Sequence, residues 1–493
     1  MDSQKMNKLC EALEWDAFAR GSISARVEKL GDLSGDIGSV SVTRDSECQL
    51  SAEISAETDG TLLRREMERF RQGEIPEGSL LFAGDERESL ELTHVLVGSL
   101  TTSRREESTA TRAQLHLGRA TQRFWNPNGP SVLAEWYISG PQPNTYARVT
   151  SREYSFTFSR RRSGMFGDSD DAEPIVKPPH GHPPDSSSSR DYFLLTPAVG
   201  VRAILTSVPK KYGPSWSQNV SIGYRYDGVP EEATRKTLAE GIGIFFGRHM
   251  LPIGETVFDS QGYPIANVGW SPWGQDAQSI SRAPDEPLFA CDYRSTESSL
   301  NKFLGMYLRA CDEFDLSSVA WTIWIARRVA LGPDLALYAV AMERLMNSWF
   351  RSTRSGSSGT YMPKDRFEAL LGDELASAGS KLNGHVHGDR ILRRLSSAFQ
   401  MGVNERFEVF FDELGLKCSD GELRVIRARN RSAHGGGIGD PQEALRLSRA
   451  YRVLLNRALL QVLGHDGAYI DYSVLGFPEK PLREPSGGVA GAG

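Results

Sequence analysis

The sequence has few cysteines and no long apolar run. Its five cysteines, Cys10, Cys48, Cys291, Cys311 and Cys418, are scattered without a Cys-x-x-Cys pair, so neither a disulfide framework nor a cysteine zinc site is expected. No run approaches the roughly 20 apolar residues that a membrane-spanning helix needs, and the amino terminus lacks the apolar core of a signal peptide. We therefore expect a cytoplasmic protein that does not contact a membrane.

An excess of positive charge is also absent. The formal net charge is -6, which excludes a globally basic nucleic-acid binder and leaves room only for a local basic face. The length of 493 residues is enough for two or three domains with large cores. The composition therefore predicts a modular protein in which any site for a polyanion is local.

Alternating apolar residues in the first half predict strands. They recur at period two at Cys48, Leu50, Ala52 and Ile54, at Tyr154, Phe156 and Phe158, and in the runs 90–97, 132–138 and 192–205. Between 163 and 190 the chain is rich in Pro, Ser, Gly and Asp and too polar to bury, which predicts a mobile insertion. We expect a β-rich domain over residues 1–229.

The pattern changes to helical spacing after Glu231. A helical stretch is predicted to about His249, and almost everything beyond Ser295 reads as helix. The predicted fold class is α+β, a β-rich amino-terminal domain followed by an all-α bundle. We expect a connecting region at 230–331, the bundle at 332–475 and a flexible tail at 476–493.

Start and stop signals place the helices of the bundle. One is predicted to begin at Pro333-Asp334, and a pair is predicted at 389–401 and 404–414, ending at Gly415. Ser419 and Glu422 have the spacing of a capping box, so a helix should begin there and end at the glycines 435–437. Asp440-Pro441, with Glu443, predicts the start of a last helix that runs to Gly464.

The sequence IRARNRSAHGGG closes the helix that is predicted to start at Ser419. Asn430 and His434 are four residues apart and share a face with Leu423 and Arg427, so polar side chains interrupt a stripe that is expected to be apolar. His434 would lie in the last turn, where the helix dipole favours the imidazolium form. Its titration could then straddle neutral pH, as acid-base chemistry requires.

The arginines of the same segment suit a phosphodiester. Arg429 offers a planar, permanently charged fork that matches phosphate oxygens, and Arg424, Arg427 and Arg431 add local positive charge. We therefore predict a catalytic group of Arg429, Asn430 and His434, with Arg424, Arg427 and Arg431 as RNA-binding residues.

The motif resembles the active motif of HEPN ribonucleases, in which four to six residues lie between an Arg and a His and a polar residue directly follows the Arg. Arg429, Asn430 and His434 match that pattern. A β-rich front half, an early bundle helix with Glu343, the RNRSAH motif and a final helix before GHDGAYIDY resemble the ApeA-like branch of bacterial antiphage, abortive-infection proteins. The likeness covers 332–475; in the front half it rests on order and class.

The resemblance implies an endoribonuclease, a hydrolase that cuts RNA without a metal or other cofactor. It implies tRNA among the substrates, a homodimer that joins two motifs through the HEPN bundle, and products with 2',3'-cyclic phosphate and 5'-hydroxyl ends. The β-rich domain would sense a phage-derived trigger and restrain the nuclease.

Two other interpretations stay open. The bundle could serve only for dimerisation in a non-catalytic sensor or adaptor, because Arg and His at a helix end can also cap carbonyls. The GHVHGD segment, with His385, His387 and Asp389, has a spacing that could contribute to a metal site, although two ligands in a loop more often form a solvated turn.

Overall fold

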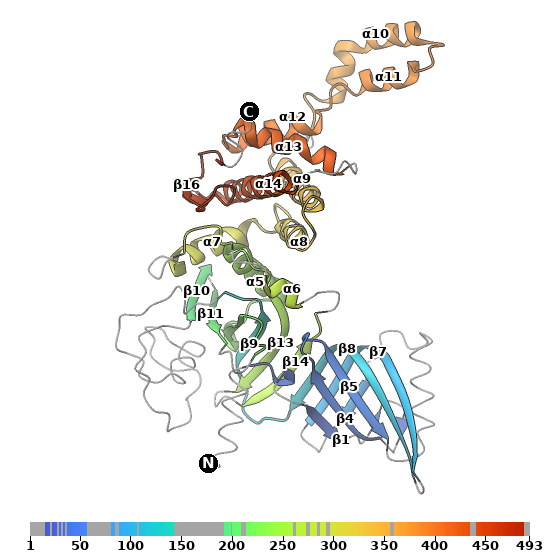
Figure 1. Ribbon diagram of the computed structural model, residues 1–493, viewed down its shortest axis with the longest axis vertical. Helices are drawn as coiled ribbons and strands as arrows, with labels where there is room; N and C mark the ends of the chain where they lie inside the picture. The colour runs from blue at the N-terminus through green and yellow to red at the C-terminus, as the bar shows by residue number, and fades with distance from the viewer. Residues whose placement is uncertain are drawn as a thin grey trace. The chain divides into compact units, whose positions relative to one another are not determined.

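The structure is a computed structural model, shown in Figure 1, that consists of two compact units. The first comprises Met1–Pro287 and Cys291–Gly305, and the second Leu288–Ala290 and Met306–Gly493. The described residues are 15–19, 22–26, 29–30, 33–34, 37–56, 80–83, 88–105, 108–141, 192–198, 200–208, 213–259, 263–272, 277–282, 286–291, 296–354, 359–433 and 440–487.

An antiparallel sheet forms the first unit. The described strands are β1 (Ile23–Arg26), β2 (Lys29–Leu30), β3 (Leu33–Ser34), β4 (Ile37–Arg44), β5 (Leu50–Ala56), β6 (Leu80–Ala83), β7 (Glu88–Arg105), β8 (Ser108–Phe124), β9 (Pro130–Ile138), β10 (Tyr192–Ala198), β11 (Val201–Ser207), β12 (Asn219–Arg225), β13 (Leu251–Asp259) and β14 (Pro264–Trp270). The strand order is β10-β11-β12-β9-β13-β14-β8-β7-β6-β2-β3, with β5 on β8, β4 on β5 and β1 on β4.

Period-two alternation predicted these strands well where the described residues test it. Leu50, Ala52 and Ile54 are buried on one face of β5. Cys48 lies instead in the preceding turn, with φ 64°. The run 192–205 forms the hairpin β10–β11, which turns at Gly200 with φ 82°. Tyr154, Phe156, Phe158 and the expected insertion 163–190 lie outside the described residues.

Long β8 joins the two parts of the sheet. Its first half pairs with β5 and its last residues pair with β14, while β7 runs along its length (Figure 1). A buried arginine reinforces the junction: the Arg44 guanidinium contacts the Asp16 carboxylate at 3.0 Å and donates to the carbonyl oxygens of Trp270 at 2.8 Å and Ile253 at 2.6 Å. Hydrogen bonds on all three nitrogens compensate for burial of the charge.

Helix α5 (Glu232–Phe246) lies on the sheet, close to the range predicted for it. Its buried side chains include Ile242 and Phe245, and it ends at Gly247 in the left-handed conformation, with φ 63°. The expected connecting region 230–331 divides between the units. Because β13 pairs with β9 and β14 with β8, residues 251–259 and 264–270 belong to the sheet of the first unit, on which α5 packs. A short helix, α6 (Ala277–Arg282), follows.

Helices make up most of the second unit. Helix α7 (Thr296–Ala310) is shared by the two units; the others are α8 (Leu316–Ala326), α9 (Pro333–Thr353), α10 (Lys364–Leu382), α11 (Gly388–Ser396), α12 (Val403–Leu414), α13 (Asp420–Ala433) and α14 (Pro441–Val462). Helices α9, α12, α13 and α14 pack on one another, and α8 packs on α9. The predicted start at Pro333 is confirmed, as is the stop at Gly415, which has φ 66°.

The carboxy-terminal segment is folded as far as Gly487. Strand β15 (Ala468–Ile470) pairs with β16 (Glu479–Pro481), Leu482 is buried, and Lys480 contacts Asp471 at 2.9 Å. The expectation of a flexible tail over 476–493 fails as far as Gly487, because backbone groups of Leu482 and Ser486 bond to Arg457 and Glu422 of the bundle.

None of the helices that the structure describes combines the length and apolar character that crossing a bilayer requires.

Candidate functional site

The helix that carries the Arg-Asn motif begins with the predicted capping box. The Ser419 hydroxyl accepts a hydrogen bond from Glu422 N at 3.2 Å, and Ser419 N donates to Glu422 Oε2 at 2.9 Å. Each residue thus satisfies a backbone N–H of the first turn, as expected from the i, i+3 spacing. The start of α13 is therefore defined by its own sequence.

Glu422 has a second partner that spacing along α13 does not reveal. Arg457 of α14 donates from Nη1 to Glu422 Oε1 at 2.5 Å, and both side chains are fully buried. Arg457 also donates to the carbonyl oxygens of Lys417 at 2.9 Å and Leu482 at 3.2 Å. Ser486 N donates to Glu422 Oε1 at 3.1 Å. These bonds join the first turn of α13, the last third of α14 and the carboxy-terminal segment.

That segment is held by further polar contacts. The Arg457 guanidinium lies 5.3 Å from the centre of the Tyr469 ring, and burial raises the pKa of Tyr469. Burial alone would raise the pKa of Asp471 too, but hydrogen bonds from Ser473, Gly487 and Lys480 outweigh it and lower that pKa. Asp471 is therefore ionised and paired at neutral pH.

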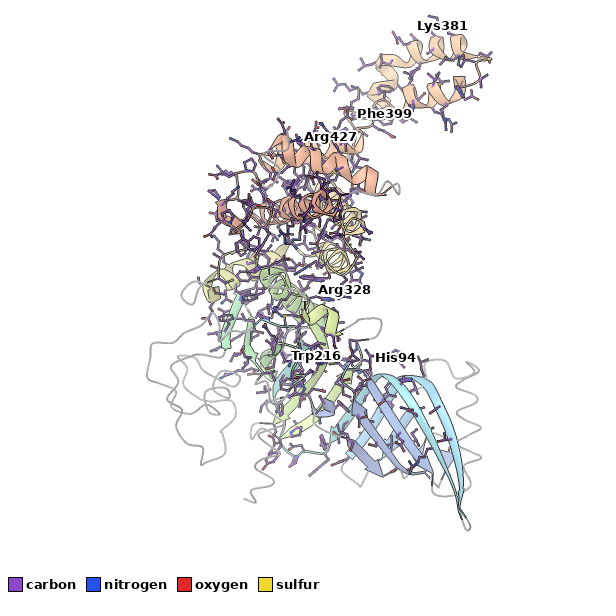
Figure 2. All side chains as sticks on the ribbon, in the orientation of Figure 1. His94, Trp216, Arg328, Lys381, Phe399 and Arg427 are labelled. Carbon is purple, nitrogen blue, oxygen red and sulfur yellow. The ribbon has the colours of Figure 1, made fainter. Side chains whose placement is uncertain are left out.

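Two of the predicted RNA-binding arginines lie on the solvent side of α13. Arg424 and Arg427 are both exposed, almost one turn apart (Figure 2 labels Arg427). Arg427 Nη2 lies 3.6 Å from Glu408 Oε1 of α12, with both side chains about half exposed or more. An exposed pair at this distance is weak, so a phosphate could displace Glu408.

The buried side of α13 differs from the expected one. The stripe that was expected to be apolar includes Leu423 and Arg427, but Leu423 is only half-buried and Arg427 is exposed. Glu422, Val425 and Ile426 are buried instead. The helix is rotated about its axis relative to the prediction. Because Glu422 pairs with Arg457 inside the bundle, the residues on the same side of α13, Val425 and Ile426, are buried as well.

The predicted catalytic residues are described to different extents. Arg429, Asn430 and Arg431 belong to α13 by its bounds, Asp420–Ala433, but their side chains lie outside what the structure describes. His434, which follows Ala433 in the sequence, and the glycines 435–437 lie outside the described residues. The arrangement of Arg429, Asn430 and His434 therefore stays a prediction. Glu343 of α9 is half-buried.

The next helix begins where the sequence predicts it. Asp440 is the N-cap of α14, and its side chain accepts a hydrogen bond from Gln442 N at 2.9 Å, with Pro441 in the first turn. The sequence IRARNRSAHGGG, residues 426–437, thus includes the end of α13 and is separated from Asp440 by two residues.

A metal centre is not assembled by the described side chains. Among them, no group of three or more His, Cys, Asp and Glu is placed to hold an ion. The rings of His385 and His387 have centres 6.3 Å apart, both side chains are exposed, and His387 N donates to His385 Nδ1 at 3.2 Å. This arrangement is that of a hydrogen-bonded, solvated turn.

A buried polar cluster in the first unit escaped sequence reasoning. Glu135 of β9 and Glu255 of β13 are direct cross-strand partners. Arg235 of α5 lies 2.8 Å from Glu135 and 3.5 Å from Glu255, and the hydroxyls of Tyr137 and Tyr224 donate to Glu135 at 2.9 Å and 3.4 Å. The residues come from four separate elements, so no local pattern could have identified them.

The electrostatics of the cluster follow from that geometry. Burial first, and then the charge of Glu135, raise the pKa of Glu255, which Arg235 only partly offsets. Burial and the same carboxylate hold the pKa values of Tyr137 and Tyr224 well above the ordinary one. Each polar group has a partner inside the cluster, so we assign it a structural role.

Comparisons with protein-family models, with curated proteins and with solved structures find no match.

Proposed function

We propose that the chain is a defence endoribonuclease of the HEPN type, in which α9, α12, α13 and α14 are the HEPN bundle and Arg429, Asn430 and His434 form the catalytic group. One observation carries the proposal. The Arg-Asn pair lies in the last turns of a helix that ends just ahead of a tightly capped successor, and His434 follows its last residue, Ala433. This is where the resembling motif places them.

The reaction needs a base, an acid and a cation, and the motif offers these groups. The ribose 2'-oxygen attacks the adjacent phosphorus, the P–O5' bond breaks, and the products carry a 2',3'-cyclic phosphate and a 5'-hydroxyl. His434 accepts the proton of the 2'-hydroxyl, or donates one to the leaving 5'-oxygen. Arg429 stabilises the charge that develops on the phosphate oxygens, and Asn430 orients the phosphate by hydrogen bonding. The resemblance implies that this chemistry needs no metal.

One helix does not bring Arg429 and His434 together. They are five positions apart, which corresponds to roughly 140° around a continued helix. Two motifs that face each other across a two-fold axis solve this problem, because Arg429 of one protomer can then hold the phosphate while His434 of the other moves the proton. We therefore propose a homodimer through the bundle.

The exposed arginines of α13 fit a role in holding the RNA backbone. Arg424 and Arg427 share the solvent side of the helix that carries the motif, and Arg431 follows Arg427 by four residues. Contacts to phosphates contribute affinity without sequence preference and weaken as salt rises. tRNA is a substrate that such a local basic ridge can engage despite the net negative charge of the chain.

The first unit would act as the sensor. A cytoplasmic nuclease that cuts host RNA must be restrained until infection, and a separately folded β-rich unit can bind a phage-derived trigger. Such control would give the abortive-infection behaviour that the resemblance implies.

A non-catalytic adaptor is the alternative function. In that case the bundle would only dimerise, and His434 could be replaced without loss of function.

Incubation of the purified protein with total tRNA tests the proposal directly. We expect new fragments with 5'-hydroxyl and cyclic phosphate ends, which ligation-based end mapping detects, and no fragments with the His434→Ala variant. Cleavage that is unchanged in that variant would show that His434 is not catalytic. Absence of cleavage of any RNA, with and without phage lysate, would favour the adaptor.

A further inference from the structure

Helices α10 and α11 form a hairpin that carries an unpartnered apolar face. The base of the hairpin is closed by an antiparallel bridge between Thr360 and Gln400, with Tyr361 N donating to Phe399 O at 2.8 Å and Met401 N to Gly359 O at 2.8 Å. Figure 2 labels Phe399 at this base and Lys381 near the other end. The hairpin is therefore a discrete element between α9 and α12.

Almost all residues of α10 and α11 are at least partly exposed to solvent. Phe367 and Gly388 are their only buried residues. Leu370 and Leu371 of α10 are 59% and 42% exposed, and Ile391 and Leu395 of α11 are 38% and 41% exposed. A lone pair of helices with one buried aromatic residue lacks the core that normally stabilises such an element. This deficit predicts that something covers the hairpin.

Three of these exposed apolar residues, Leu371, Ile391 and Leu395, lie on one side of the hairpin. Gly379 of α10 faces Leu392 of α11, because a Cβ added at Gly379 would lie 3.4 Å from Leu392 Cδ2. From this contact, helical spacing places Leu371 on the same flank of the antiparallel pair as Ile391 and Leu395, whereas Leu370, nine residues before Gly379, points away from α11. Glu374 and Arg394, both exposed, border that flank on opposite helices.

We infer that this face binds the same face of a second copy of the chain, so that two hairpins form a four-helix bundle. A two-fold axis parallel to the helices places α10 of one copy over α11 of the other, and all neighbouring helices are then antiparallel, as in up-down bundles. Leu371, Ile391 and Leu395 of both copies become the core.

Charge complementarity supports a second copy as the occupant. In this arrangement Glu374 of one copy lies over Arg394 of the other, and the contact occurs twice. Counted along the helix axes from the Gly379–Leu392 contact, the positions of Glu374 and Arg394 differ by only ~4.5 Å. An arginine side chain can span this offset. Within the described part of the chain, neither side chain has an ion pair that would compete.

The charge balance argues against RNA as the occupant. Residues 359–401 hold six basic side chains, Lys364, Arg366, Lys381, Arg390, Arg393 and Arg394, and five acidic ones, Asp365, Glu368, Asp373, Glu374 and Asp389. Faces that bind nucleic acid are strongly positive, whereas a nearly neutral face with both signs is suited to pairing with itself.

A charge exchange tests the inference in the full-length protein. Sedimentation velocity over a concentration series would compare the wild type with Glu374→Arg, Arg394→Glu and the double variant. Each single variant places like charges opposite each other twice, so we expect self-association to weaken at least about tenfold. The double variant restores both pairs and should associate like the wild type. An equimolar mixture of the single variants should form heterodimers.

Further variants control for folding and test the apolar contact. Leu371→Ala with Leu395→Ala should weaken association at least about tenfold through lost burial. Val386→Ala, at the 89% exposed turn, should leave it unchanged, and circular dichroism checks the helix content of each variant. If the chain also self-associates through a second surface, each single variant should lose only the association step that the hairpin makes. The double variant should regain that step.

The inference fails if the wild type stays monomeric, if the single variants associate like the wild type, or if the double variant does not recover. A monomer that binds RNA and loses this binding in Arg394→Glu would instead assign the face to RNA. The result is independent of the proposed nuclease, because His434→Ala should abolish cleavage and leave hairpin association intact.

Discussion

Arg457 and Glu422 form a fully buried ion pair, with Nη1 and Oε1 2.5 Å apart, between the last third of α14 and the first turn of α13. Glu422 also completes the capping box with Ser419. The same carboxylate thus starts the helix that bears the Arg-Asn motif and fixes it to its neighbour. A change in this pair should therefore affect both stability and the candidate site.

Replacing Arg457 by Met should destabilise the second unit strongly. The substitution leaves the Glu422 carboxylate buried without its cation, which typically costs about 3–5 kcal/mol. Urea denaturation followed by helix circular dichroism measures the loss. Arg427→Met, which removes the cation of the exposed pair with Glu408, is the matched control and should change stability little. Equal effects of the two variants would contradict the importance of the buried pair.

The same Glu-to-Gln substitution should affect stability differently at the two facing glutamates of the first unit, Glu135 and Glu255. Glu135→Gln removes the carboxylate that accepts from Arg235 and two tyrosines, so we expect a loss of about 1–3 kcal/mol. Glu255→Gln removes the like charge opposite Glu135 while the 2.8 Å contact of Arg235 with Glu135 remains, so stability at neutral pH should rise or stay the same. Denaturation curves at pH 7 would test this; equal losses would contradict it.

The advantage of Glu255→Gln should depend on pH. Burial and the charge of Glu135 raise the pKa of Glu255 in the folded protein, so folding favours its protonated form. The stability linked to this group is complete below the unfolded pKa, about 4.3, and is lost as pH rises through the folded pKa. As pH falls from 7 toward about 4, the folding stability of the wild type should therefore increase relative to that of Glu255→Gln. A constant difference over this window would show that the raised pKa does not matter for stability.

RNA cleavage should persist in EDTA and leave 5'-hydroxyl ends. The reason is that the proposed nucleophile is the ribose 2'-hydroxyl, activated by His434, with Arg429 supplying positive charge at the phosphate. Cleavage of tRNA in chelator, with the ends identified by their ability to be phosphorylated, is the measurement. Complete loss of activity in EDTA that a divalent cation restores would overturn this mechanism.

A mixed dimer should recover activity that its parents lack. Arg429→Ala and His434→Ala homodimers are both expected to be inactive, whereas a heterodimer with one of each retains one Arg429 and one His434 on different chains. Purification through two different tags, followed by cleavage assays, tests this. If verified heterodimers stay inactive while wild-type/mutant dimers are active, each site is built within one chain.

Removal of the first unit should make the activity of the proposed nuclease independent of the phage-derived trigger. Residues 290–493 expressed alone are expected to be more toxic than the full chain or unresponsive to phage, because the sensor is missing. Growth and plaque assays measure the two outcomes. Full phage-dependent protection by this fragment would remove the sensor role of the first unit.

Local signals in the sequence predicted much of the helical unit. Pro333, Ser419 with Glu422, and Asp440 each start a helix as expected, and Gly415 ends one. These signals act over three or four residues, within which a side chain can reach a backbone N–H of its own turn. Alternation in β5 predicted its buried face for a similar reason, since neighbouring side chains point to opposite sides.

The candidate site was only partly predictable. The sequence placed Arg424 and Arg427 on one helix with Arg429, and both prove to be exposed, but it assigned the buried face of α13 to Leu423 and Arg427. The apolar pattern is weak there because a charged residue, Glu422, occupies the core. Only the presence of Arg457, 35 residues away, makes that burial favourable.

The sequence by itself determined several of the strands and helices, where some of the helices begin and end, and that the Arg-Asn pair would lie near the end of one of them. The tertiary structure decided which side of α13 is buried, that β13 and β14 complete the sheet, that the carboxy-terminal segment folds back, and that Glu135 faces Glu255 beside Arg235. The first group depends on contacts within a turn or along a strand. The second depends on buried charges and backbone groups finding partners tens to hundreds of residues away, which only the assembled core provides.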